Sequence, residues 1–84
     1  MITFGTIQEI YPSESKINVS ILTPRDEKII CSTSHIGDLE VGTYVAIRGN
    51  KHKELITDAI IMRYDPDKDH IYDKKYQSFW KELK

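Results

Sequence analysis

Short apolar segments that alternate with polar residues constrain the fold of this chain more than any other feature. The clearest covers residues 16–23, where Ile17, Val19 and Ile21 are separated by polar residues. This period of two is typical of a half-buried antiparallel strand. Further strand-like segments are expected at residues 2–11, 27–33, 43–49 and 54–64. Because no long helical pattern lies between them, they predict a small all-β barrel.

Turn residues separate these segments. Pro12 and Pro24 each begin a short polar connection, and the run Asn50–Lys53 predicts a hairpin turn after a fourth strand that ends at Gly49. Gly5, together with a change in the alternation, predicts a bulge in the first strand.

The composition fits one soluble domain. The chain has 84 residues, of which 39% are apolar and 30% charged, and its formal net charge is −1. Such a balance provides no overall attraction to nucleic acid or to an anionic membrane. Any binding of that kind must therefore come from a local patch.

The pattern changes after residue 64. Pro66 disfavours a helical conformation at Asp65, and Asp67 or Asp69 is well suited to cap a helix that follows. Beyond this point apolar residues recur at helical spacing, which predicts an amphipathic helix at about residues 70–83. The stripe consists of Tyr72, Tyr76, Phe79, Trp80 and Leu83. The expected organisation is a barrel over residues 1–64, then a linker and helix over residues 65–84.

The expected location is intracellular, either cytoplasmic or nuclear. Cys31 is the single cysteine, which excludes an intramolecular disulfide and favours a reducing compartment. The N-terminal residues lack the pattern of a secretory signal. No apolar stretch approaches the roughly 20 residues that a membrane span needs, so no membrane partner is expected.

Three segments carry a resemblance to a known fold. They are Gly5–Ile10, Leu39–Gly49 and Leu55–Ile61. The second is similar to the fourth-strand signature of many nucleic-acid-binding OB domains, in which a Gly-polar turn precedes alternating apolar residues that end at Gly. The third looks like the strand that closes such barrels. The resemblance implies a five-stranded Greek-key OB-fold barrel.

A barrel followed by an amphipathic helix further resembles the small subunits of replication protein A and of related telomere-capping complexes. In those families the terminal helix packs against helices of partner subunits. The chain departs from the usual OB pattern between the third and fourth strands, because residues 34–39 are too few for the helix that often lies there.

The resemblance places single-stranded nucleic acid on the second and third strands, between the one-two and four-five loops. Such binding needs aromatic faces for bases and cations for the backbone. The candidates are Tyr11, Lys16, Arg25, Lys28, Tyr44, Arg48, Lys51, His52 and Lys53. Lys51, His52 and Lys53 are the strongest of these, because they share one hairpin tip. The alternative is that all nine are ordinary surface residues, among which acidic residues repel phosphates.

The aromatic stripe of the C-terminal helix has two interpretations. Its aromatic residues are of the kind that dominates protein interfaces, which predicts docking on a partner or self-association. The alternative is that the helix covers the open end of its own barrel.

No cofactor, metal or catalytic site is expected. Asp65, Asp67 and Asp69 begin like a calcium-binding loop, but His70 stands where the loop needs Gly and Tyr76 where it needs Glu. The cysteine and the histidines lack zinc-ligand spacing, and no catalytic motif occurs, so an enzyme is the weakest hypothesis.

The leading hypothesis is a nucleic-acid-associated OB module. It binds single-stranded DNA weakly through the barrel and assembles with partner subunits through the C-terminal helix. One alternative is a protein-protein adaptor without nucleic-acid binding, which the balanced charge favours. The other is an RNA-binding OB domain, which the sequence does not distinguish from a DNA-binding one.

Overall fold

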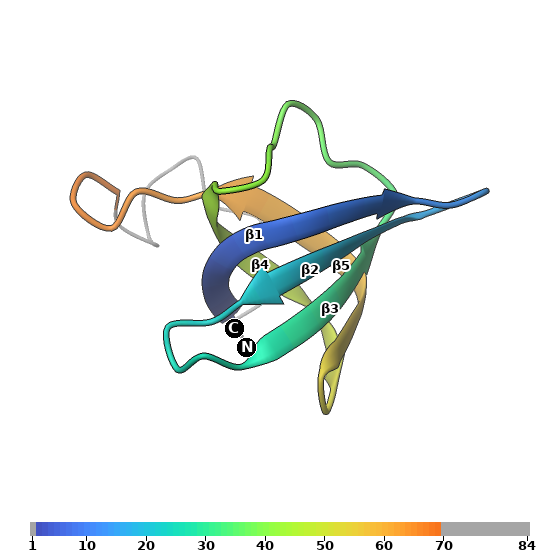
Figure 1. The fold of residues 1–84 in the computed structure, drawn as a ribbon, viewed down its shortest axis with the longest axis horizontal. Helices are drawn as coiled ribbons and strands as arrows, with labels where there is room; N and C mark the ends of the chain where they lie inside the picture. Colours follow the sequence, from blue (N-terminus) through green and yellow to red (C-terminus); the bar gives the residue numbers. More distant parts are fainter. Residues whose placement is uncertain (1, 70–84) are drawn as a thin grey trace.

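Five strands account for most of residues 2–69, the part of the chain that this computed structural model describes (Figure 1). They are β1 (Ile2–Pro12), β2 (Ile17–Leu22), β3 (Lys28–Thr33), β4 (Tyr44–His52) and β5 (Leu55–Arg63). They pair in the order β1-β2-β3-β5-β4, and β4 also pairs with β1, which closes the barrel. The predicted all-β architecture is confirmed, and the strand order is consistent with an OB-like fold. The predicted helix lies outside the described residues.

β1 joins the two halves of the barrel. Its residues 2–6 pair with β4 and its residues 6–12 pair with β2, and Figure 1 shows it curving across the front of the molecule. The predicted bulge at Gly5 is misplaced, since the register shift lies between Ile7 and Glu9. Gly5 instead allows a close approach to β2, because a Cβ there would lie 2.7 Å from the carbonyl oxygen of Leu22.

The predicted end of the fourth strand at Gly49 is wrong. β4 continues to His52, and its last residues still pair with β5. The register shifts between Arg48 and Asn50, so Gly49 lies at a bulge inside the strand rather than at its end. Glycine suits this position because a Cβ would lie 2.7 Å from the carbonyl oxygen of Thr57. The sequence pattern suggests a stop at this glycine, although glycine also permits a bulge.

The interior contains the three apolar residues of β2 that the alternation predicts. Val19 and Ile21 have no exposed surface, and Ile17 is half-buried and packs against the same core. The other buried members of this cluster are Ile7, Ile29, Cys31, Val45, Ile47, Ile56, Ala59 and Ile61. The prediction that Ile17, Val19 and Ile21 point inward is confirmed.

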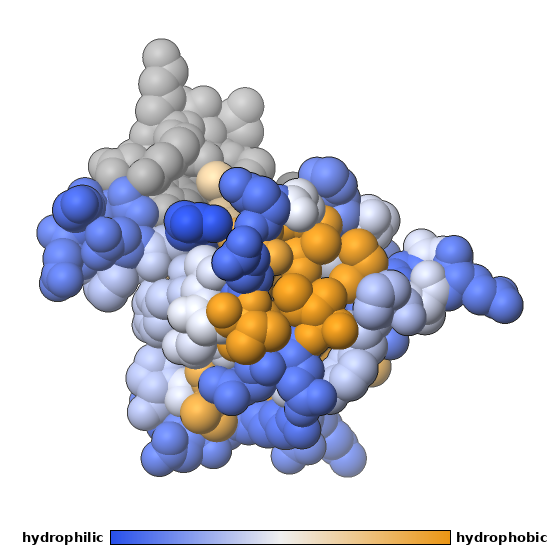
Figure 2. Space-filling model, turned by 45° about the horizontal axis from the view of Figure 1, so that its top comes forward, coloured by the Kyte–Doolittle hydropathy of each residue, from blue (hydrophilic) through white to orange (hydrophobic). Residues whose placement is uncertain are grey.

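Residues 34–43 cover one end of the barrel, as the green loop at the top of Figure 1. No helix forms in this segment, in agreement with its length. Ile36 and Leu39 pack against the core instead, together with Ile10 and Ile17 from the β1–β2 hairpin. Figure 2, which brings this side forward, shows apolar surface framed by hydrophilic residues, and Val41 is 60% exposed.

Among residues 2–69 there is no helix of the length and apolar character that a membrane span requires.

Val19→Ala is expected to lower the free energy of unfolding by about 1–3 kcal/mol, because it removes two buried methyl groups and leaves a cavity. Asn18→Ala is the matched control, since Asn18 precedes Val19 and points to the outside of the same strand. Its expected effect is within about 0.5 kcal/mol. Urea denaturation of both variants measures the difference. Equal stabilities for Val19→Ala and the wild type would contradict the observed orientation of β2.

Candidate nucleic-acid interface

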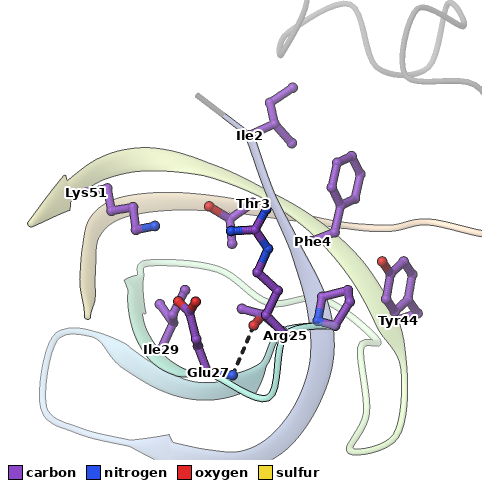
Figure 3. A pocket seen from close by; sticks show the side chains of 10 residues that line it. Ile2, Thr3, Phe4, Arg25, Glu27, Ile29, Tyr44 and Lys51 are labelled. Atoms are coloured by element: carbon purple, nitrogen blue, oxygen red, sulfur yellow. Dashed lines mark hydrogen bonds between the residues drawn. The ribbon is translucent and has the colours of Figure 1, made fainter. Parts of the chain in front are cut away.

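An open groove of about 410 Å³ runs between the start of β1, the β2–β3 loop and the far end of β4. Its lining consists of Ile2, Thr3, Phe4, Thr23, Pro24, Arg25, Glu27, Ile29, Tyr44 and Lys51. Three of the predicted nucleic-acid-binding residues, Arg25, Tyr44 and Lys51, are therefore brought to one place. In Figure 3 the side chain of Lys51 extends toward the middle of the groove, where Arg25 lies.

The β2–β3 loop holds Arg25 at its tip. Thr23 closes the loop, since its amide donates to the carbonyl oxygen of Glu27 at 2.9 Å and its Oγ1 accepts the Glu27 amide at 3.1 Å. Asp26 completes the turn with φ of 62°, a left-handed conformation that aspartate tolerates better than most residues. These local bonds position Arg25 over the groove without help from distant parts of the chain.

Lys51 reaches the groove because β4 continues past its bulge. It pairs with Ile56 of β5 and is exposed. Among residues 2–69 no salt bridge engages Arg25 or Lys51. Both cations are thus available to an anionic ligand, while Glu27 contributes one opposing charge to the same groove.

Aromatic rings stand at the other side of the groove. Phe4 and Tyr44 are stacked with ring centroids 6.5 Å apart and planes 8° from parallel. Tyr64 joins them, with its centroid 5.0 Å from that of Phe4. Figure 3 shows Phe4 and Tyr44 side by side and away from Lys51. The cations and the rings thus lie on opposite sides of the groove. This arrangement suits a nucleic-acid strand, which has charged phosphates and flat bases.

The β1–β2 hairpin does not contribute to this groove. Tyr11 lies near the end of β1, and its hydrogen bond to Glu9 raises the pKa of the Tyr11 phenol. Lys16 forms a salt bridge with Asp58 at 3.6 Å, which links the hairpin to β5. Tyr11 and Lys16 are therefore separated from the other candidates.

The remaining candidates lie on three different parts of the barrel. Lys28 begins β3, exposed and paired with Leu22. Arg48 is half-buried in the middle of β4 on the outside of the barrel. His52 ends β4, and Lys53 follows it in the hairpin turn with φ of 57°. The predicted partner-binding residues Tyr72, Tyr76, Phe79, Trp80 and Leu83 lie outside the described residues.

Sequence reasoning misses Phe4 and Tyr64 as site residues. It places Phe4 in the first strand without assigning a face, and Tyr64 at the end of the fifth. The sequence contains a signal for both. Phe4 alternates with Ile2, and Tyr64 alternates with Met62, the last residue of a run from Ala59 that is apolar at every position. A continuous apolar run indicates a strand with both faces covered.

Comparison with known proteins finds no family model, no curated protein and no solved structure that matches this chain. The resemblance to replication protein A-like subunits therefore stays a prediction.

Proposed function

We propose that this barrel is an OB-type module that binds single-stranded nucleic acid weakly along the groove, as the small replication protein A-like subunits suggest. Phosphates contact Arg25 and Lys51, and bases stack on Tyr44 and Phe4. Neutralised phosphates release counterions, and stacking tolerates every base, so binding has little sequence preference. Lys28 and Lys53 add positive charge near the two loops, and His52 adds a ring that can donate a hydrogen bond.

One observation supports this proposal above the others. Arg25 lies in the β2–β3 loop and Lys51 near the end of β4, far apart in the sequence, and both line one groove with two stacked rings at its other side. The groove needs no excess positive charge over the whole chain, which is consistent with a net charge of −1. Assembly through the C-terminal stripe remains a separate prediction, because the stripe lies outside residues 2–69.

A protein adaptor without nucleic-acid binding is the second candidate. Glu27 favours it, because a carboxylate lining the groove repels phosphates.

The double variant Arg25→Ala/Lys51→Ala is expected to bind a labelled oligothymidylate more weakly and to lower the salt dependence of binding. The slope of log K against log salt should fall by about 1.4, at about 0.7 for each phosphate contact on a single strand. Fluorescence anisotropy over a range of salt concentrations measures this. Parallel titrations with oligouridylate distinguish a preference for DNA from one for RNA.

Lys16→Ala/Lys68→Ala is the matched control, since it removes the same charge from exposed positions outside the groove. We expect this control to keep the wild-type slope. An equal loss of affinity and of salt slope in both double variants would show that the binding site lies outside the groove. Failure of the wild type to bind at millimolar oligonucleotide would favour the adaptor.

A further inference from the structure

Three rows of paired residues cross β1, β4 and β5 on the outside of the barrel. The rows are Ile2–Arg48–Ile60, Phe4–Ala46–Met62 and Thr6–Tyr44–Tyr64. The intervening residues Val45, Ile47 and Ile61 belong to the core. Because side chains alternate between the two faces of a strand, the rows point outward. Every member except Thr6 and Arg48 is apolar or aromatic, and these members form what we term the outer apolar face.

This composition is unusual for the outside of an antiparallel sheet, which ordinarily carries polar residues. The outside of β2 and β3 in the same barrel is more polar, with Asn18, Lys28 and Ser32 among its residues. The outer apolar face instead forms its own cluster around Ala46, which has no exposed surface. The residues packed against Ala46 are Ile2, Phe4, Met62 and Tyr64. Ile60 is 40% exposed and the other members apart from Ala46 are half-buried, so the face offers apolar surface that a further element could bury.

Asp69, the last described residue, lies beside this face. Asp69 lies in a turn, since its amide donates to the carbonyl oxygen of Asp65 at 2.7 Å and its Oδ2 accepts the Asp65 amide at 2.8 Å. The hydroxyl of Tyr64, a member of the outer apolar face, donates to the Asp69 carbonyl oxygen at 3.2 Å. The described part of the chain therefore ends within reach of the third row.

The dimensions of the remaining chain match the face. Three strands about 4.8 Å apart and five residues along each give roughly 10 Å by 13 Å. A helix is about 10 Å wide, and a stripe from Tyr72 to Leu83 is about 17 Å long at 1.5 Å per residue. The helix that the sequence predicts over these residues would therefore be long enough to span the rows from Tyr64 toward Ile2.

From this geometry we infer that residues 70–84 dock on the outer apolar face of their own barrel through Tyr72, Tyr76, Phe79, Trp80 and Leu83. The short connection favours the same molecule over a second copy, because it gives an effective concentration on the order of millimolar. The end of the barrel near residues 34–43 is a poorer site, since Ile36 and Leu39 already cover it.

The outer apolar face and the groove share Ile2, Phe4 and Tyr44. A docked segment and a base stacked on these rings would therefore compete for the same surface, whereas Arg25 and Lys51 lie outside the face. The docking itself rests on the barrel and on the stripe, and it holds whether or not the groove binds nucleic acid.

Trp80 is the single tryptophan and reports on docking in the full chain. Ile60→Lys places a charge on the outer apolar face, and Leu55→Lys is its matched control: both residues lie on β5 and are 40% exposed, but Leu55 lies outside the face. We expect a shielded, blue-shifted Trp80 emission in the wild type. In Ile60→Lys the emission should shift to the red and acrylamide quenching should increase several-fold, whereas Leu55→Lys should behave as the wild type.

A second measurement needs no variant. Nuclear Overhauser contacts between stripe aromatic protons and the methyl groups of Ala46, Ile60 or Met62 are expected in a protein that sediments as a monomer. Trp80 exposed to quencher in the wild type overturns the docking. So does shielding that Ile60→Lys leaves unchanged, or contacts to Ile36 and Val41 instead. Shielding that appears only with a dimer in sedimentation shows a second copy as the occupant and overturns docking in the same molecule.

Discussion

Gly5→Ala is expected to lower the free energy of unfolding by about 3 kcal/mol, at the upper end of the usual cost of overpacking. A Cβ at this position would lie 2.7 Å from the carbonyl oxygen and 3.2 Å from the carbonyl carbon of Leu22, and it would also overlap the side chain of Ile21. A flexible side chain moves aside easily, but the backbone of Leu22 is held in the β1–β2 pairing. The two strands must therefore separate where β1 passes from β4 to β2.

Thermal unfolding measures this effect, with an expected fall in melting temperature of roughly 12–24 °C for a domain of this size. Gly42→Ala is the matched control. Gly42 has φ of 93°, but no heavy atom lies within 4 Å of the place that a Cβ would take, so alanine there adds only backbone strain of about 1–2 kcal/mol. A Gly5 variant less damaging than the Gly42 variant would mean that β1 and β2 do not approach as closely as observed.

Cys31 is expected to react with iodoacetamide at pH 8 about 10³-fold more slowly in the folded chain than in urea, because the thiolate is the reactive species. Burial in the core raises the pKa of the Cys31 thiol from 9.0 to about 12. Three pH units correspond to that factor, and the absence of exposed surface at Cys31 slows the reaction further. Mass spectrometry of timed samples measures the rate. Modification at the unfolded rate would contradict the burial of Cys31.

The raised pKa of Cys31 also makes the folding stability decrease as the pH rises. Above pH 9 the unfolded chain loses the Cys31 proton while the folded chain keeps it, so folding stability falls as pH rises, by up to about 1.4 kcal/mol per unit until pH 12. Below pH 9 both states hold the proton and the contribution is constant. Cys31→Ala removes this slope, so the difference in pH dependence between the two proteins isolates the thiol.

Gly5 and Cys31 illustrate what a sequence pattern can and cannot predict. The alternation around Ile17, Val19 and Ile21 identifies the buried face of β2, because successive side chains of any strand point to opposite sides. Cys31 follows Ile29 and Ile30 in the sequence, and the structure buries it in the core. The pattern marks Gly5 and Gly49 only as local breaks, whereas their structural role depends on β2 and β5, which lie elsewhere in the sequence.

The candidate site was predictable only in part. Arg25, Tyr44 and Lys51 are among the candidates because cations and aromatic rings are needed for single-strand binding. Their residue types do not separate them from Tyr11 and Lys16, which the β1–β2 hairpin carries away from the groove. That separation depends on the direction of each hairpin, and hairpin direction is a property of the closed barrel.

The sequence by itself determines the all-β class, the approximate strand positions and the inward face of β2, because alternation with a period of two is encoded by adjacent residues. Only the tertiary structure decides which strands are neighbours, that β4 continues past Gly49, and that Phe4, Ala46 and Met62 share one row. Strand pairing joins residues that are distant in the chain, and a shift of register by one residue would turn each side chain to the other face. The groove and the outer apolar face both arise from that register.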